Sequence, residues 1–131
     1  MVDCIFCKII AGEIPAAKVH EDDQFLAFLD INPVTPGHTM IIPKTHFKTM
    51  TETPDALVGE IFIKAKELMP KLKKAMAADY VAVSVVGVDV PHFHVHLVPR
   101  RLDDGLANWW PTKKYGEGEM VAVAEKIKAE I

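Results

Sequence analysis

The amino-acid sequence predicts an α+β fold built on a largely antiparallel sheet. Several short runs have the pattern of strands, and one long stretch has apolar residues at helical spacing. No repeat period and no Ser/Gly-rich linker divides the chain, so its 131 residues are expected to form a single domain over residues 1–131. We therefore expect about five strands, one long central helix and short N- and C-terminal helices.

The N-terminal third predicts a short helix followed by three strands. Asp3 suits the N-cap of a helix over residues 4–11, and Gly12 suits the position just after its end. Strand-like patterns follow over residues 18–21, 25–30 and 38–42. Pro43 is expected to end the third strand, and both alternating faces of the second carry apolar residues.

The remainder of the chain predicts the long helix, two more strands and a terminal helix. Thr53 can cap a helix that continues to Met76, and Pro70 is expected to bend or break that helix. Strands are expected over residues 80–86 and 92–98, with Pro99 closing the second. A loop over 105–118 holds two tryptophans that are expected to pack in the core or an interface, and an amphipathic helix covers 119–131.

Charge and hydropathy exclude several classes of protein. The net charge is −3 with no basic stripe, which disfavours a general nucleic-acid binder or a binder of anionic membranes. The longest apolar runs are strand-sized and far too short to span a bilayer. Residues 1–4 do not start a secretory signal, and two cysteines make no disulfide framework. We therefore expect a cytoplasmic protein with reduced thiols.

Three histidines recur at every second position, at His92, His94 and His96. On a strand this period places all three imidazoles on one face, about 6.6 Å apart along the backbone, and sends the intervening apolar residues into the core. Two kinds of site use such a row. One is a zinc enzyme, although the outer pair, about 13 Å apart, cannot easily share one ion. The other is nucleophilic catalysis, in which a neutral imidazole attacks phosphorus and forms a phosphohistidine.

The stretch Pro91–Arg100 resembles the His-x-His-x-His-x-x signature of the histidine-triad (HIT) family. Further stretches resemble family blocks in family order, over residues 4–15, 28–33, 36–38 and 42–46. The resemblance covers about residues 1–100, and residues 101–131 correspond to the variable C-terminal part.

The resemblance implies a homodimeric enzyme that acts at the α-phosphorus of a purine nucleotide, such as a nucleoside phosphoramidate or dinucleoside polyphosphate. His94 would be the nucleophile, and His96 would donate to a non-bridging phosphate oxygen. His38 and the carbonyls of the strand itself would help to orient the nucleophile. Asp30 would accept from the ribose hydroxyls. The walls of the base site would be Phe6, Ile9, Ile14, Phe28, Ile31 and Met40, for which core packing is the alternative. No redox cofactor is implied.

Cys4 and Cys7 form a C-x-x-C pair, which is half of a tetrahedral zinc site. A redox pair is the alternative, although no strand precedes it as in thioredoxin-like proteins. His46 and His92 complete a structural zinc site in a C-x-x-C branch that this chain resembles.

Val88 and Asp89 depart from the family pattern, in which many members have glutamine and then serine before the triad. Asp89 is expected to point away, to pair with Arg100, Lys44 or a triad imidazole, or to tune the enzyme to another leaving group. This departure supports an alternative function, a nucleotide-binding or interaction protein with vestigial catalysis. A third hypothesis is a zinc hydrolase that uses His94 and His96 as ligands.

Overall fold

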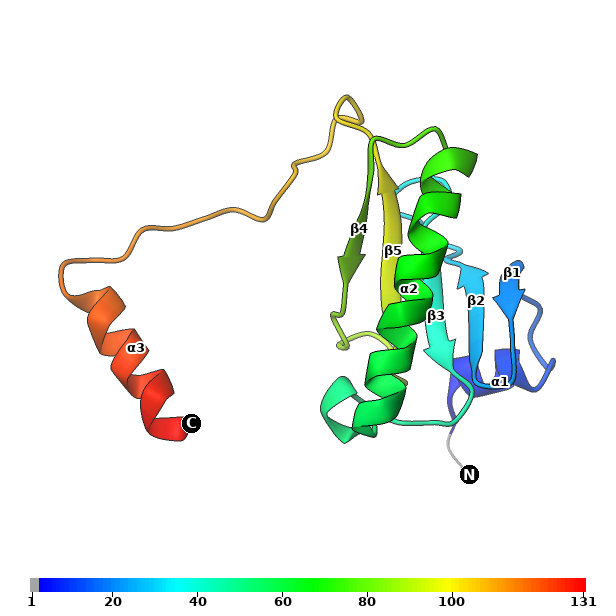
Figure 1. The fold of residues 1–131 in the computed structure, drawn as a ribbon, viewed down its shortest axis with the longest axis horizontal. Coiled ribbons are helices and arrows are strands. Elements are labelled where there is room, and N and C mark those ends of the chain that lie inside the picture. Colours follow the sequence, from blue (N-terminus) through cyan, green and yellow to red (C-terminus); the bar gives the residue numbers. More distant parts are fainter. Residues whose placement is uncertain (1–2) are drawn as a thin grey trace.

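Five strands form one sheet in the order β1-β2-β3-β5-β4, in which every neighbouring pair is antiparallel (Figure 1). This computed structural model describes residues 3–131. Met1 and Val2, which belong to the segment expected not to start a secretory signal, lie outside the described residues. The strands are β1 (Lys18–Glu21), β2 (Phe25–Leu29), β3 (Thr39–Pro43), β4 (Tyr80–Ser84) and β5 (Val95–Arg100). The helices are α1 (Ile5–Ile10), the 3₁₀ turn η1 (Met50–Glu52), α2 (Asp55–Ala75) and α3 (Glu119–Glu130). The α+β prediction is confirmed.

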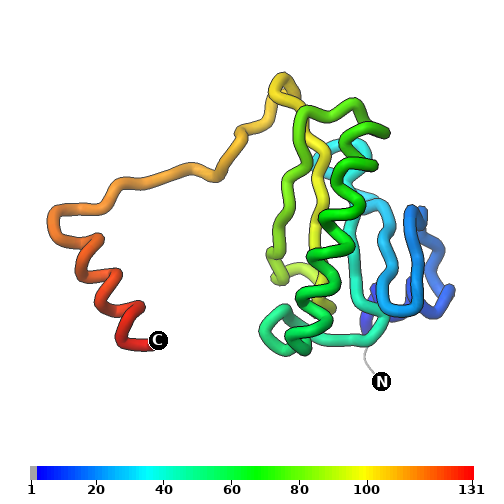
Figure 2. Tube along the Cα trace, in the orientation of Figure 1, coloured from blue at the N-terminus to red at the C-terminus, as the bar shows by residue number. Residues whose placement is uncertain are grey.

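The sheet carries a hydrophobic core on each of its two faces. One core joins α2 to the side chains of alternate strand positions, including Phe25, Ile41 and Leu97. The other joins α1 to the intervening positions, including Leu26 and Ile42. Because successive strand residues point to opposite faces, this division follows directly from the sequence of β2 and β3. Figure 2 shows α2 running along one face of the sheet.

The helix starts differ from the predicted caps. The N-cap of α1 is Cys4, whose sulfur accepts from the Cys7 N–H at 3.4 Å, whereas Asp3 forms an ion pair with Lys8. The N-cap of α2 is Pro54, because the Thr53 hydroxyl instead donates to the Thr49 carbonyl at 2.8 Å. These two predicted caps are therefore wrong. Gly12 follows the end of α1 with a φ of +80°, as predicted.

Helix α2 continues through Pro70, so the predicted break at this proline is wrong. Proline removes the hydrogen bond to the carbonyl of Lys66, one turn earlier. Both residues are exposed, so water can hydrate that carbonyl. The apolar face of the helix, which includes the fully buried Ile61, lies against the sheet and holds the helix together across the missing bond.

Strand β5 begins three residues later than predicted and continues past Pro99. Its pairing with β3 starts at Val95, because the backbone before it makes other bonds, such as Phe93 N–H to Phe47 carbonyl at 2.7 Å. The same pairing stops at Leu97, so the missing N–H of Pro99 breaks no bond to β3.

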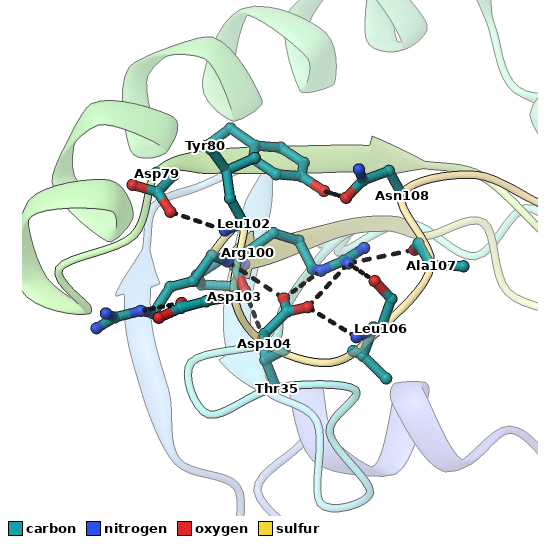
Figure 3. Close-up of polar contacts among 12 residues, drawn as sticks. Thr35, Asp79, Tyr80, Arg100, Leu102, Asp103, Asp104, Leu106, Ala107 and Asn108 are labelled. Carbon is teal, nitrogen blue, oxygen red and sulfur yellow. Dashed lines mark hydrogen bonds and ion pairs between the residues drawn. The ribbon is translucent and has the colours of Figure 1, made fainter.

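After β5 the chain leaves the sheet as an extended segment, and α3 stands apart from the other elements (Figure 1). Trp109 and Trp110 lie on this segment and are about 70% exposed, so they do not pack in the core of their own chain. Figure 3 shows the base of the segment, where Arg100 bonds to Asp104 and to the carbonyls of Leu106 and Ala107. Among residues 3–131, no helix is both long enough and apolar enough to cross a membrane.

Candidate active site and metal centre

The three alternating histidines lie on the α1 side of the sheet, as the period-2 pattern predicts. The intervening Phe93, Val95 and Leu97 belong to the core under α2. Only His96 lies within β5, but the alternation extends back through the residues before the strand. All three imidazoles are buried, His92 and His94 almost completely.

The His94 imidazole is held in one tautomer by the backbone. Its Nδ1 lies 2.7 Å from the His92 carbonyl oxygen, which can only accept, so Nδ1 carries the proton. The lone pair is therefore on Nε2, which is buried and has no hydrogen-bond partner. The edge of Phe6 packs near this ring, with a centroid separation of 5.2 Å. His94 thus has one ring nitrogen held by the backbone and a second, Nε2, that is buried without a hydrogen-bond partner.

A second chain of hydrogen bonds fixes His38 and His96. The Val34 N–H donates to Nδ1 of His38 at 3.1 Å, so Nε2 of His38 carries the proton. That Nε2–H donates to Nδ1 of His96 at 2.9 Å. Nε2 of His96 is therefore a donor. The structure connects His38 to His96, whereas His94 is oriented by the His92 carbonyl.

Burial keeps both of these rings neutral. It lowers the pKa of His38, and the charge of Asp30 offsets only part of that shift. It also lowers the pKa of His96, and the neighbouring His94 and His38 lower it further. Neutral rings are what the donor chain requires, because a protonated Nδ1 on His96 has no lone pair for the His38 proton.

The predicted nucleotide-binding residues lie in three different surroundings. Asp30 lies beside the donor chain, with Oδ2 3.8 Å from Nε2 of His38. Four of the predicted base-site residues are buried in the core on the α1 side of the sheet, namely Phe6, Ile9, Phe28 and Met40. Ile14 packs against that core. Ile31 is 90% exposed and does not join them.

Asp89 lies next to Nε2 of His94. Its Oδ1 lies 3.5 Å from Nε2 of His94, although the Asp89 side chain is 63% exposed. The other predicted partners are engaged elsewhere, Arg100 with Asp104 and Lys44 with Glu21. Of the expectations for Asp89, the structure therefore selects the pairing with a triad imidazole.

Four side chains converge on a second centre next to the histidine row: Cys4, Cys7, His46 and His92. Their ligand atoms all lie within 4.8 Å of one another. The Cys7 sulfur is 3.3 Å from Nδ1 of His46 and 3.6 Å from Nδ1 of His92, and the two Nδ1 atoms are 3.1 Å apart. A tetrahedral zinc ion places sulfur and nitrogen ligands about 3.6 Å apart and two nitrogens about 3.3 Å apart, so the donor set fits this ion.

The tautomer of His92 also suits a metal ligand. Its Nε2 donates to the Pro43 carbonyl at 2.8 Å, which leaves the lone pair on the Nδ1 that faces the cysteines. Burial raises the pKa of the Cys7 thiol to about 11, and the hydrogen bond to Cys4 adds to this shift. Both cysteines are free thiols. His92 therefore joins the two centres, because its ring faces the thiols and its carbonyl holds His94.

The described residues contain a second group with metal-ligating atoms, formed by Asp30, His38 and His96. His94 belongs to neither group in this part of the chain. It lines a small pocket of about 190 Å³ together with Lys48, Met50 and Phe93. The zinc-hydrolase hypothesis, which needs His94 as a ligand, has no support from this arrangement.

Two functional groups are invisible to side-chain patterns, namely the Pro43 carbonyl and the Val34 N–H. Each fixes the tautomer of a site histidine. Both are backbone atoms, so no residue type in the sequence marks them.

Comparison with known proteins identifies the family. Residues 11–103 match the model of the HIT domain. An adenosine 5′-monophosphoramidase from Schizosaccharomyces pombe, hnt1, is 35% identical over an alignment of 136 positions. The alignment covers 99% of this chain and 99% of that protein.

Two crystal structures share the fold closely. SMU.412c from Streptococcus mutans UA159 aligns with a TM-score of 0.87 and 37% identity, over 99% of this chain and 86% of that one. A Zn-bound histidine triad family protein from Mycobacterium smegmatis aligns with a TM-score of 0.77 and 31% identity, over 98% of each chain.

Proposed function

Because this chain belongs to the HIT family, we propose that it is a hydrolase that cleaves a bond at the α-phosphorus of a purine nucleotide. The substrate is a nucleoside phosphoramidate or a dinucleoside polyphosphate. The observation that carries the proposal is Nε2 of His94, a buried lone pair without a hydrogen-bond partner. The activity named for the S. pombe relative supports the same class of reaction.

The reaction has two steps. The Nε2 lone pair of His94 forms a bond to the α-phosphorus, and the bond from phosphorus to the leaving group breaks with its electron pair. Water then attacks the phosphorus, loses a proton to solvent and releases the nucleoside monophosphate, and the electron pair of the N–P bond returns to Nε2. The His92 carbonyl stabilises the positive charge that the ring gains in the first step, since it accepts from Nδ1 at 2.7 Å.

The neighbouring residues bind and orient the nucleotide in this proposal. His96 donates its Nε2–H to a non-bridging phosphate oxygen, and His38 holds His96 in the donor tautomer. Asp30 accepts from the ribose hydroxyls. The buried apolar residues around Phe6 and Phe28 pack beside the base, and Ile31 reaches it from an exposed turn.

A second candidate function is a nucleotide-binding protein with vestigial catalysis. It is favoured by one observation, the Asp89 carboxylate in front of Nε2 of His94. That carboxylate occupies space that an approaching phosphate needs and repels its charge.

Multiple-turnover hydrolysis of adenosine 5′-phosphoramidate and diadenosine tetraphosphate separates the two functions. The wild-type enzyme should turn over at least one of them, and His94→Ala should reduce kcat/KM by about 10⁴-fold because the nucleophile is lost. The matched control is His20→Ala, which removes a histidine of β1 that belongs to neither centre and pairs with Asp22. Binding of AMP without turnover by the wild type would favour the vestigial function.

We further propose that Cys4, Cys7, His46 and His92 hold one structural zinc ion per chain. A bound ion would link α1 to the residues before β5. The two cysteines would bind it as thiolates, so their protons would be released. Elemental analysis of protein purified without chelator should find about one zinc per chain, and Cys7→Ser should lose it and unfold at a lower temperature. Less than a few tenths of a zinc per chain in the wild type would contradict this proposal.

We also propose that the chain forms a homodimer. The edge strand β4 and the turn after it expose Val83 and Val86, and the C-terminal segment exposes Trp109 and Trp110. Such a large apolar surface is typical of an interface. Light scattering should give twice the chain mass of 14.5 kDa, and a monomer at micromolar concentration would contradict the proposal.

A further inference from the structure

We propose that Asp89 is a specificity residue that favours amine leaving groups over anionic ones at His94. This inference rests on the proposed hydrolase function. The carboxylate lies 3.5 Å from the nitrogen that attacks phosphorus, so its charge acts at short range across the phosphorus on the departing group during the first step. It thereby distinguishes a phosphoramidate from a dinucleoside polyphosphate.

The Asp89 charge is not neutralised by a fixed cation. Within residues 3–131, the one ion-pair partner found for Asp89 is His94, which is the neutral nucleophile in the proposed reaction. Two basic side chains of the sheet that could have paired with it are engaged elsewhere, since Lys44 pairs with Glu21 and Arg100 with Asp104. A full negative charge therefore faces the site.

The carboxylate is ionised under ordinary conditions. Partial burial raises the pKa of Asp89, whereas hydrogen bonds from the N–H groups of Asp89 and Val90 lower it, and a positive charge on His94 or His96, when present, lowers it further. The pKa of Asp89 therefore lies below its usual value. The preceding residue, Val88, is 87% exposed and carries no polar group that can offset the charge.

The two substrate classes place different charges beside this carboxylate. When the P–N bond of a phosphoramidate breaks, its electron pair goes to nitrogen, which takes a proton from solvent and leaves as an amine. The negative charge of Asp89 favours the proton that this nitrogen gains. When a dinucleoside polyphosphate is cleaved, the departing nucleotide carries several negative charges, and Asp89 repels them.

The α-phosphate itself is also repelled, but this effect is common to both substrates. The ratio of the two kcat/KM values cancels it, because both reactions form the same adduct on His94 and differ only in what leaves. The ratio therefore isolates the interaction of Asp89 with the leaving group.

The experiment measures kcat/KM for adenosine 5′-phosphoramidate and diadenosine tetraphosphate. Asp89→Asn, which keeps the shape and removes the charge, should shift the ratio toward the tetraphosphate by about tenfold. Asp89→Glu should retain the wild-type preference. Asp23→Asn removes the same charge from an exposed position between β1 and β2 and should leave the ratio unchanged.

A second measurement varies the ionic strength. Added salt screens exposed charges, so the wild-type preference for the phosphoramidate should narrow as ionic strength rises, whereas Asp89→Asn should respond weakly. If the wild type hydrolyses the phosphoramidate through His94 but Asp89→Asn keeps the wild-type ratio, this inference is wrong and the proposed function stands. If the wild type turns over neither nucleotide, the proposed function is wrong and the inference falls with it.

Discussion

The two ends of β5 hold buried polar side chains in opposite ways. At the C-terminal end, Arg100 donates from Nε to Asp104 at 2.6 Å and from Nη2 to the same carboxylate and to two carbonyls. Asp104 also accepts from the N–H groups of Arg101 and Leu106. At the N-terminal end, Nε2 of His94 is buried without any hydrogen-bond partner.

The difference indicates that the buried polar groups at one end of β5 stabilise the fold, whereas those at the other end serve the chemistry of the site. A satisfied network such as the one around Arg100 (Figure 3) holds the turn after β5 in place. An unsatisfied buried atom costs stability, so its presence in a folded protein indicates a role that the fold alone does not explain. We therefore expect substitutions at the histidine end to reduce activity and substitutions at the Arg100 end to reduce stability.

After His94→Ala, the largest effect should come from His96→Ala. Removal of its Nε2–H takes away a donor to the phosphate, so kcat/KM should fall by about 10²–10³-fold. Because His38 also loses its buried acceptor, some stability should be lost, so kcat/KM is compared per folded molecule with His20→Ala, the control outside the site. If activity fell only in proportion to the amount of folded protein, the proposed difference between the two ends of β5 would be contradicted.

The next effect should come from Arg100→Leu. The Asp104 carboxylate and two carbonyls lose their donor, so the melting temperature should fall by roughly 5–10 °C. The matched control is Arg101→Leu, because Arg101 pairs with Asp103 at an exposed position and should matter little. Activity per folded molecule should stay near the wild-type value in both variants, and a selective loss in Arg100→Leu would contradict this.

Gly37→Ala should affect the loop between β2 and β3, which lies against Pro99 of β5. Gly37 has a φ of +91°, and an added Cβ would lie 2.7 Å from Cγ of Met76. The substitution should reduce the free energy of unfolding by about 1–2 kcal/mol. Gly59→Ala is the control, since its Cβ meets nothing within 4 Å and lies in a helix, where alanine stabilises by about 1 kcal/mol. Equal effects of the two substitutions would argue against strain at Gly37.

The smallest effect is a pH dependence of stability. The pKa of both His38 and His96 is lowered by burial, so the unfolded chain binds more protons between their folded pKa values and about 6.5. Their contribution to stability is therefore present above about pH 6.5 and is lost as pH falls toward the folded values. Melting curves from pH 5 to 8 should show this slope, and His38→Asn should flatten it.

The sequence pattern was sufficient for the sheet and for the face on which the histidines lie. Alternation in β2 and around His94 depends on the two-residue period of a strand, which local sequence carries. The cysteine and histidine cluster was also predicted as a set, and the structure brings those four side chains together. Pro70 shows the limit of local rules, because tertiary packing keeps α2 continuous across it.

Other features depend on contacts that no local pattern contains. The Cys4 cap arises because the thiol lies at the start of α1, where Asp3 turns instead to Lys8. The tautomers of His38 and His92 are set by backbone atoms of distant residues. The position of Asp89 also required coordinates, since several partners were compatible with its place in the sequence.

The alternation of histidine and apolar residues before and within β5 also limits how this stretch can change in length. Loss or gain of a single residue between Phe93 and His96 would turn every side chain on one side of it to the opposite face. Imidazoles would then enter the core under α2, and apolar groups would replace the nucleophile. We therefore expect this segment to tolerate no insertion or deletion, whereas the extended stretch around Trp109, whose side chain is about 70% exposed, can vary in length more freely.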